Sequence, residues 1–247
     1  MTALYQKNTA LLNEVDDFEY KARKGTKNQV VIVGISNKGL EKIEGASHIE
    51  ISFPEYDETG KNQVTEIGGR FTQFYLVNDA ISSRTISIID GWKNILTIGN
   101  YAFSGCKFLS IPDNWGKVLQ IANRAFLYSK FQNLPDDWGE VRYIGDSAFE
   151  SCKIRKLPDD FGQIHTLGSR SFYNTMIEEL PEDFGNIRRV GNNAFGFCKN
   201  LKKGPQGHHV RRRGRRRNLR IFRGRRNVTD LGHFHKSSKW FLEPHED

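Results

Sequence analysis

The sequence predicts a β-rich solenoid, and three observations support that prediction. Five phenylalanines stand 23 residues apart, at Phe103, Phe126, Phe149, Phe172 and Phe195. Five further apolar positions recur at the same interval between residues 95 and 203. Each unit also contains a turn such as "IPDNWG" or "LPDDWG", so the stretches between turns are too short for an ordinary helix. We therefore expect two short strands in each unit, joined by turns.

Stacking of the units is needed because one unit is too small to fold alone. Ordering its backbone costs on the order of 1 to 2 kcal/mol per residue, more than its few apolar side chains can offset. When neighbouring units stack, each recurring apolar position packs on its own counterpart and the units share one core.

The turn residues have a local explanation. Proline presets its own backbone angle, Asp accepts bonds from nearby amides, and glycines such as Gly116 and Gly139 allow a positive φ. The recurring carboxylates would also form a stripe along the stack. Turn capping is the simpler interpretation, and a calcium or cationic-partner surface is the alternative.

The three cysteines share one position of the unit. Cys106, Cys152 and Cys198 alternate there with Ser129 and Thr175. Parallel rungs about 4.8 Å apart put two cysteines ~10 Å apart, whereas a disulfide needs Cα atoms within about 7 Å. We expect small, weakly hydrogen-bonding residues, with no disulfide and no metal or redox site.

Residues 1–60 are less regular and are predicted to be a polar leader with a small β cap. Two apolar runs, 30–35 and 49–54, indicate strands joined by a turn, which would cover one end of the stack. Residues 1–28 hold no apolar run suited to a secretion signal or a membrane span. We therefore expect a cytoplasmic monomer.

The charge is divided sharply along the chain. Residues 1–200 hold 23 Lys and Arg against 25 Asp and Glu, whereas residues 201–247 hold 14 against 4. The segment 204–247 is predicted to be a disordered basic tail, because a run of like charges repels itself. Three interpretations stay open: a nucleic-acid-binding arm, a solvated extension without a partner, or the product of a reading-frame shift. The nucleic-acid contacts would be the arginines of the first cluster, Arg211, Arg212, Arg213, Arg215, Arg216 and Arg217 within 211–226.

The recurring pattern "IGxxAFxxC" followed by "IP" or "LP" resembles the BspA-like class of leucine-rich repeats. Examples are "IGNYAFSGCKFLSIP" and "IGDSAFESCKIRKLP", and the likeness covers about residues 61 to 203, or six to seven units of which five are regular. The resemblance implies a right-handed leucine-rich-repeat solenoid used for adhesion and protein recognition, often at the cell surface or secreted. It implies no catalytic residue.

No catalytic motif, phosphate loop, dinucleotide fingerprint or metal-ligand set is present, so the sequence predicts no enzyme and no cofactor. A protein ligand is the expected partner. The variable polar residues beside the phenylalanine and cysteine positions are the predicted contacts: Asn100, Arg124, Asp146, Arg170, Asn193, Lys107, Lys130, Lys153 and Lys199.

Overall fold

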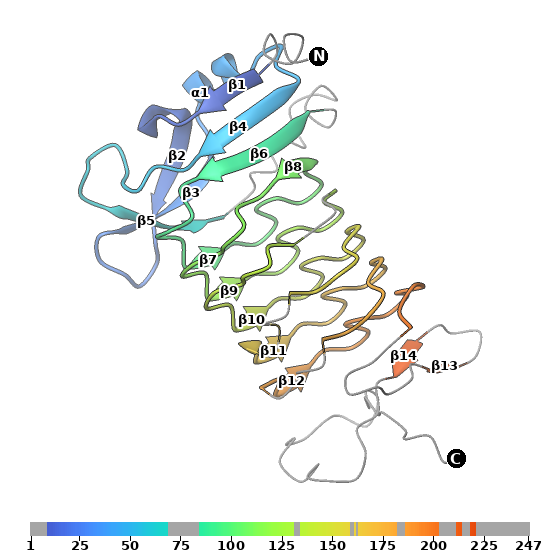
Figure 1. The fold of residues 1–247 in the computed structure, drawn as a ribbon. Coiled ribbons are helices and arrows are strands. Elements are labelled where there is room, and N and C mark those ends of the chain that lie inside the picture. The colour runs from blue at the N-terminus through green and yellow to red at the C-terminus, as the bar shows by residue number, and fades with distance from the viewer. Residues whose placement is uncertain are drawn as a thin grey trace.

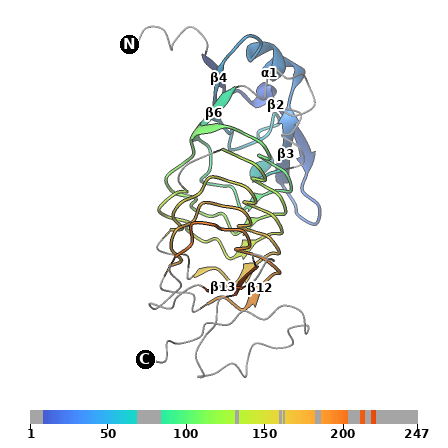
Figure 2. The same cartoon turned by 90° about the vertical axis from the view of Figure 1, so that its right-hand side faces the viewer.

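The repeating units form an elongated stack whose N-terminal end carries longer strands and a short helix (Figure 1). The structure, a computed structural model, describes residues 9–68, 84–130, 134–158, 161, 163–181, 186–202, 211–213 and 218–220. Seen from the side, successive units are turns of similar outline placed one below another (Figure 2).

One sheet of eight strands runs along the whole stack in the order β12-β11-β10-β9-β7-β5-β3-β2. All of its neighbouring strands are parallel except β2 and β3, which are antiparallel. Its strands are β2 (Phe18–Ala22), β3 (Gln29–Ile35), β5 (Gln63–Ile67), β7 (Thr97–Ile98), β9 (Gln120–Ile121), β10 (Tyr143–Ile144), β11 (Thr166–Leu167) and β12 (Arg189–Val190). In β9 to β12 the partners are 23 residues apart, as Ile144 and Leu167 are, so the sequence interval is the strand register.

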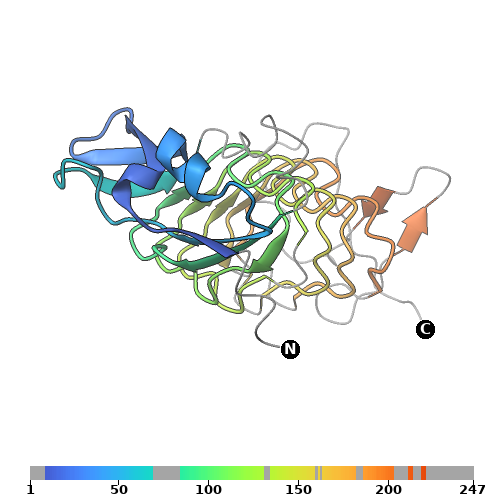
Figure 3. The same cartoon turned by 90° about the horizontal axis from the view of Figure 1, so that it is seen from above.

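A second, four-stranded parallel sheet has the order β1-β4-β6-β8 and is confined to the N-terminal part of the stack (Figure 3). Its strands are β1 (Thr9–Leu12), β4 (His48–Ser52), β6 (Thr85–Asp90) and β8 (Phe108–Ser110). Buried side chains of both sheets, such as Ile51 and Ile67, belong to one continuous core.

The N-terminal region differs from the predicted strand pair. The two apolar runs are strands β3 and β4, but they lie in different sheets and do not pair with each other. The segment expected to be a turn between them is helix α1 (Asn37–Lys42). The Ser36 side chain caps that helix by accepting a bond from the Gly39 amide at 3.1 Å, which is an N-cap that turn chemistry alone does not reveal. A short 3-10 turn, η2 (Val15–Asp17), completes the region.

The regular units hold fewer strand residues than predicted. Within the described residues, the first of them contributes two strands, β7 and β8, and each of the four later units contributes a single two-residue strand instead of two. At the second expected position, single contacts between units replace a strand, such as the parallel bridge between Lys107 and Lys130 and the 3.1 Å bond from the Glu178 amide to the Arg155 carbonyl. Part of that position, residues 131–133, lies outside the described residues.

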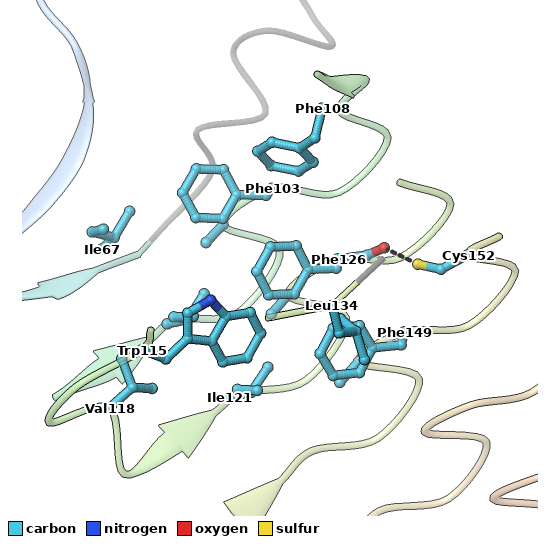
Figure 4. Close-up of a cluster of buried hydrophobic side chains, with 14 of the residues drawn as sticks. Ile67, Phe103, Phe108, Trp115, Val118, Ile121, Phe126, Leu134, Phe149 and Cys152 are labelled. Carbon is cyan, nitrogen blue, oxygen red and sulfur yellow. Dashed lines mark hydrogen bonds between the residues drawn. The ribbon is translucent and has the colours of Figure 1, made fainter. Parts of the chain in front are cut away.

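The predicted apolar positions form the core of the stack. Neighbouring rings of the phenylalanine ladder lie 5.1 to 5.5 Å apart and within 16° of parallel. Figure 4 shows Phe126 between Phe103 and Phe149, with Trp115 beside it. The prediction that the repeat extends upstream is also confirmed, because Ile67 pairs with Ile98 and the Trp92 ring lies 6.4 Å from Trp115.

The last regular unit keeps its ladder residues buried, since Phe195 is fully buried and Leu201 is 3% exposed. Beyond it, β13 (Arg211–Arg213) and β14 (Asn218–Arg220) pair antiparallel, so these two segments of the predicted disordered tail have regular structure. The rest of that prediction, including Arg215, Arg216 and Arg217, falls outside the described residues. No helix in the described part of the chain is long and apolar enough to cross a membrane.

Candidate functional site: an aromatic ridge

One corner of each unit carries a repeated left-handed backbone. In the first regular unit Tyr101 and Gly105 have φ values of 57° and 75°, and equivalent residues of the later units also have positive φ. The amides of residues 101, 103 and 105 all donate to carbonyls of the following unit, at 2.7 to 3.1 Å. The corner is therefore a hydrogen-bonded seam between units.

Large side chains occupy this seam where glycine would fit the backbone better. A non-glycine residue in the left-handed region costs about 1 to 2 kcal/mol. Nevertheless Arg124, Tyr128 and Arg170 adopt φ values of 57°, 60° and 57°, whereas the first unit has Gly105 at the position of Tyr128. Backbone strain that is kept at an exposed corner is typical of functional surfaces.

Exposed and half-buried aromatic and arginine side chains occur on this corner in four of the five regular units. Together they are here called the aromatic ridge. Its members are Tyr101, Arg124, Tyr128, Arg170, Tyr173 and Phe197. Tyr128 is 54% exposed and Tyr101 is 37% exposed, which is unusual for tyrosines in a packed repeat.

Contacts within and between units hold most of these side chains in place. The Arg124 guanidinium lies 5.4 Å from the centre of the Tyr101 ring, and that of Arg170 lies 4.2 Å from the Tyr173 ring. Arg170 also forms an ion pair with Glu150 at 2.6 Å, and the Tyr173 and Phe197 rings are 4.9 Å apart. A pre-ordered surface of tyrosine and arginine loses little entropy when it binds a partner.

The predicted contact residues divide into two groups around this ridge. Arg124 and Arg170 belong to it, and Asn193 occupies the equivalent position in the last unit with φ 57°. Asn100 and Asp146, which are exposed, also stabilise the fold. Their side-chain oxygens accept the Asn123 and Ser169 amides at 3.0 and 2.6 Å, so each fastens the next unit.

The predicted lysines lie on a neighbouring line. Lys130, Lys153 and Lys199 are exposed and Lys107 is half-buried. Sequence reasoning missed the four aromatic members of the ridge because they occupy three different positions of the unit and so form no ladder in the sequence. The signal present was that aromatic residues recur next to the phenylalanine ladder at positions that the apolar pattern does not require.

The cysteines behave as predicted. All three are free and buried. The Cys152 and Cys198 thiols donate to the carbonyls of Phe126 and Phe172 in the preceding unit at 2.9 and 3.1 Å, as the Ser129 hydroxyl does to Phe103 at 2.5 Å (Figure 4). Burial raises the pKa of the Cys106 thiol to about 12 and raises the pKa values of the other two.

The acidic turn residues also have a structural role. The Asp137 carboxylate accepts the Gly139 amide at 2.6 Å, and the Asn114 side chain accepts the Gly116 amide. Both glycines have positive φ, 54° and 53°. The prediction of turn capping by Asp is confirmed at Asp137, and in the preceding unit the capping residue is Asn114. Among the described residues no three His, Cys, Asp or Glu side chains gather as a metal site.

A groove of about 450 Å³ lies between two units near the lysines. It is lined by Arg155, Lys156, Leu157, Glu178, Glu179, Leu180 and Pro181. Arg155 and Glu178 form an ion pair across it at 3.4 Å. Among the described residues, the lining contains no histidine, cysteine, serine or threonine, so these side chains supply carboxylates and cations but no hydroxyl or thiol nucleophile.

Stacked units of this length, with a parallel sheet in register and an apolar ladder at every turn, define a leucine-rich-repeat protein. The chain belongs to the BspA type of leucine-rich repeat, whose family pattern matches residues 74–202 in six copies. Proteins of this repeat class are generally binding modules.

Similar solved structures are leucine-rich repeat proteins. The T. pallidum leucine-rich repeat protein has a TM-score of 0.50 and 18% identity, over 78% of this chain and 81% of that one. A leucine-rich cell surface protein from Faecalibacterium prausnitzii has a TM-score of 0.45 and 16% identity, over 80% of this chain and 57% of that one. No curated protein matches the sequence.

Proposed function

We propose that the chain is a non-catalytic protein-binding solenoid and that the aromatic ridge is its contact surface. The observation that carries the proposal is the exposed Tyr128, held in a left-handed conformation at a position that another unit fills with glycine. Tyrosine and arginine are the residues most enriched where protein interfaces gain their binding energy.

The geometry of the ridge supports this choice over the other exposed surfaces. Several of its side chains are fixed by contacts that cross from one unit to the next, for example Arg124 on Tyr101 and Tyr173 on Phe197. The exposed Tyr143 on the eight-stranded sheet has a ring contact with His165 at 6.2 Å, but no arginine stacks on it within the described residues. Rigid aromatic side chains are the better anchors for a protein partner.

The alternative function, nucleic-acid binding through 211–226, stays a prediction from composition. Its support is the excess of 14 Lys and Arg over 4 Asp and Glu in residues 201–247.

The experiment compares two exposed tyrosine surfaces. A double variant, Tyr101→Gly with Tyr128→Gly, removes ridge side chains at positions whose backbone favours glycine, so we expect folding stability to be kept or raised by up to about 1 kcal/mol. The matched control is Tyr143→Ala, which removes a tyrosine that is 50% exposed on the sheet.

Proteins captured by the wild-type chain are identified by mass spectrometry, purified, and titrated against all three chains by biolayer interferometry. Loss of two interface anchors should weaken the dissociation constant about tenfold or more, and the control should stay within about twofold of wild type. Equal weakening by both variants, or none by the ridge variant, would contradict the proposal.

A further inference from the structure

A row of like charges runs beside the aromatic ridge, here called the lysine row. It consists of Lys107, Lys130, Lys153 and Lys199, which occupy one position of the unit, with Met176 in the remaining unit. Lys107 and Lys130 are backbone neighbours in a parallel bridge, and the Phe108 amide donates to the Lys130 carbonyl at 2.9 Å. The side chains therefore project from adjacent turns of the stack.

The lysine row has no acidic partner within the described part of the chain, where no carboxylate lies within 4 Å of any of its four ammonium groups. Nearby carboxylates are engaged elsewhere. Glu150 pairs with Arg170 at 2.6 Å, and Glu178 pairs with Arg155 at 3.4 Å.

Stacking equal charges in register is unfavourable for the fold. Rungs are about 4.8 Å apart, and like charges directly opposite one another on neighbouring strands are destabilising. The same chain shows that the position accepts an uncharged residue, because Met176 occupies it. Since no ion pair within the described residues accounts for the four charges, their presence points to a partner of opposite charge.

We propose that the lysine row binds an acidic, extended segment of a partner protein that lies along the stack. From Lys107 to Lys199 the row covers four rung intervals, or ~19 Å, which an extended peptide of about six residues spans at ~3.3 Å per residue. Lysine ammonium groups are point charges on flexible stems, so they suit carboxylates that differ in exact position. This inference rests on the proposed function, because the row and the ridge would contact one partner.

The neighbouring tyrosines favour a polypeptide over single-stranded nucleic acid. Binding of nucleic-acid strands combines a basic groove with aromatic faces on which bases stack. Here the Tyr101 and Tyr173 rings already carry arginine guanidinium groups at 5.4 and 4.2 Å. An arginine therefore covers one face of each of these two rings, whereas no carboxylate of the described residues pairs with the ammonium groups of the lysine row.

Lysine footprinting on the full chain tests the proposal directly. The chain is labelled with an amine-reactive acetylating reagent, with and without an oligo-glutamate peptide of about ten residues, and acetylation is quantified by mass spectrometry. Excess peptide should lower labelling of the four row lysines at least about threefold, on the reasoning that ion-paired amines are shielded. Lys24, Lys27, Lys61 and Lys117, which are exposed elsewhere, are the internal reference.

Two charge-matched variants complete the test. The row variant changes Lys107, Lys130, Lys153 and Lys199 to Gln, and the control changes Lys24, Lys27, Lys61 and Lys117 to Gln. Both keep the arginines of 211–226 and the same net charge. Peptide affinity measured by fluorescence anisotropy should fall about fivefold or more in the row variant and less than about twofold in the control.

Each outcome has a defined meaning. Uniform protection of all lysines, or equal affinity loss in both variants, overturns the proposal, because binding would then follow net charge alone. Stronger row protection by oligo-uridylate than by oligo-glutamate at equal charge overturns it in favour of nucleic acid. If the row variant binds the captured partner normally while the Tyr101→Gly, Tyr128→Gly variant does not, the proposed function holds and the acidic-segment inference fails.

Discussion

The N-terminal region, residues 9–68, and the regular units, residues 95–202, build the same eight-stranded sheet by different means. Strand β3 of the first region has seven residues, whereas β9, β10, β11 and β12 have two each. In the first region long strands make most of the contacts. In the second, short strands suffice because each apolar side chain packs on its own counterpart in the next unit.

Polar contacts show the same contrast. In the N-terminal region the fully buried Asp17 carboxylate accepts the Asn13 and Glu14 amides at 3.0 and 2.9 Å and contacts the Lys42 ammonium at 2.7 Å. Three of the regular units repeat one simple bond, from Ser129, Cys152 or Cys198 to a carbonyl of the preceding unit. Contacts that occur once, such as those of Asp17, stabilise the end of the stack, whereas contacts repeated in successive units stabilise its middle.

The largest expected effect comes from breaking the repetition. Phe149→Ala removes a fully buried ring that has Phe126 at 5.2 Å on one side and Phe172 at 5.1 Å on the other. Truncating a buried phenylalanine costs about 3 to 5 kcal/mol, and the upper end applies because hydrogen-bonded units on both sides prevent collapse of the cavity. Urea unfolding followed by tryptophan fluorescence measures the loss.

The comparison variant is Phe18→Ala in β2 at the end of the sheet, where the ring contacts Phe53 at 5.7 Å. An edge strand can shift to fill the space, so we expect the lower end of the same range, about 3 kcal/mol. A larger loss for Phe18 than for Phe149 would show that the end, and not the ladder, limits stability.

An intermediate effect is expected from Asp17→Asn. The change keeps the shape but removes the charge that faces Lys42, and a hydrogen bond to a charged group contributes about 1.5 to 3 kcal/mol. Hydrogen exchange should accelerate in β2 and α1 but not in β10 and β11, because the contacts of Asp17 are local.

The control variant is Lys38→Gln, which removes an exposed ion pair to Glu14 at 2.9 Å and should leave the exchange pattern unchanged. Accelerated exchange throughout the stack would contradict the separation of the two regions.

The same contrast explains how much of the fold could be predicted from the sequence. The interval that links Phe103 to Phe195 predicted the strand register, the core positions and the free cysteines, because every unit repeats the same physical solution. The helix at Asn37–Lys42 and the pairing of β3 and β4 with other strands were missed, because they occur once and depend on tertiary contacts such as the buried Asp17.

The candidate site was predicted only in part, for a related reason. Arg124 and Arg170 were predicted as variable residues next to the ladder, and Asn100 and Asp146 share that description although their side chains bond to the backbone of the next unit. Distinguishing them requires the left-handed conformation of the corner, which places residue 124 outward and lets the side chain of residue 123 reach the amide of Asp146 at 2.8 Å. The spacing of residues in one sequence does not predict this left-handed conformation.

The smallest effect at neutral pH is expected from Cys152→Ser, which replaces one hydrogen-bonding member of the ladder by another. Ser129 already donates from the equivalent position, so the loss of stability should be below about 1 kcal/mol.

A larger difference between the two chains is expected at alkaline pH, because burial raises the pKa of the Cys152 thiol above the unfolded value of about 8.5. The stability that comes from keeping this thiol protonated is fully present below that value, and it declines as pH rises above it, since only the unfolded chain releases the proton. Wild type should therefore lose about 1 to 2 kcal/mol more than the variant between pH 8.5 and 10 in urea unfolding. An unchanged difference between the two chains over this range would mean that the thiol is not buried in the native stack.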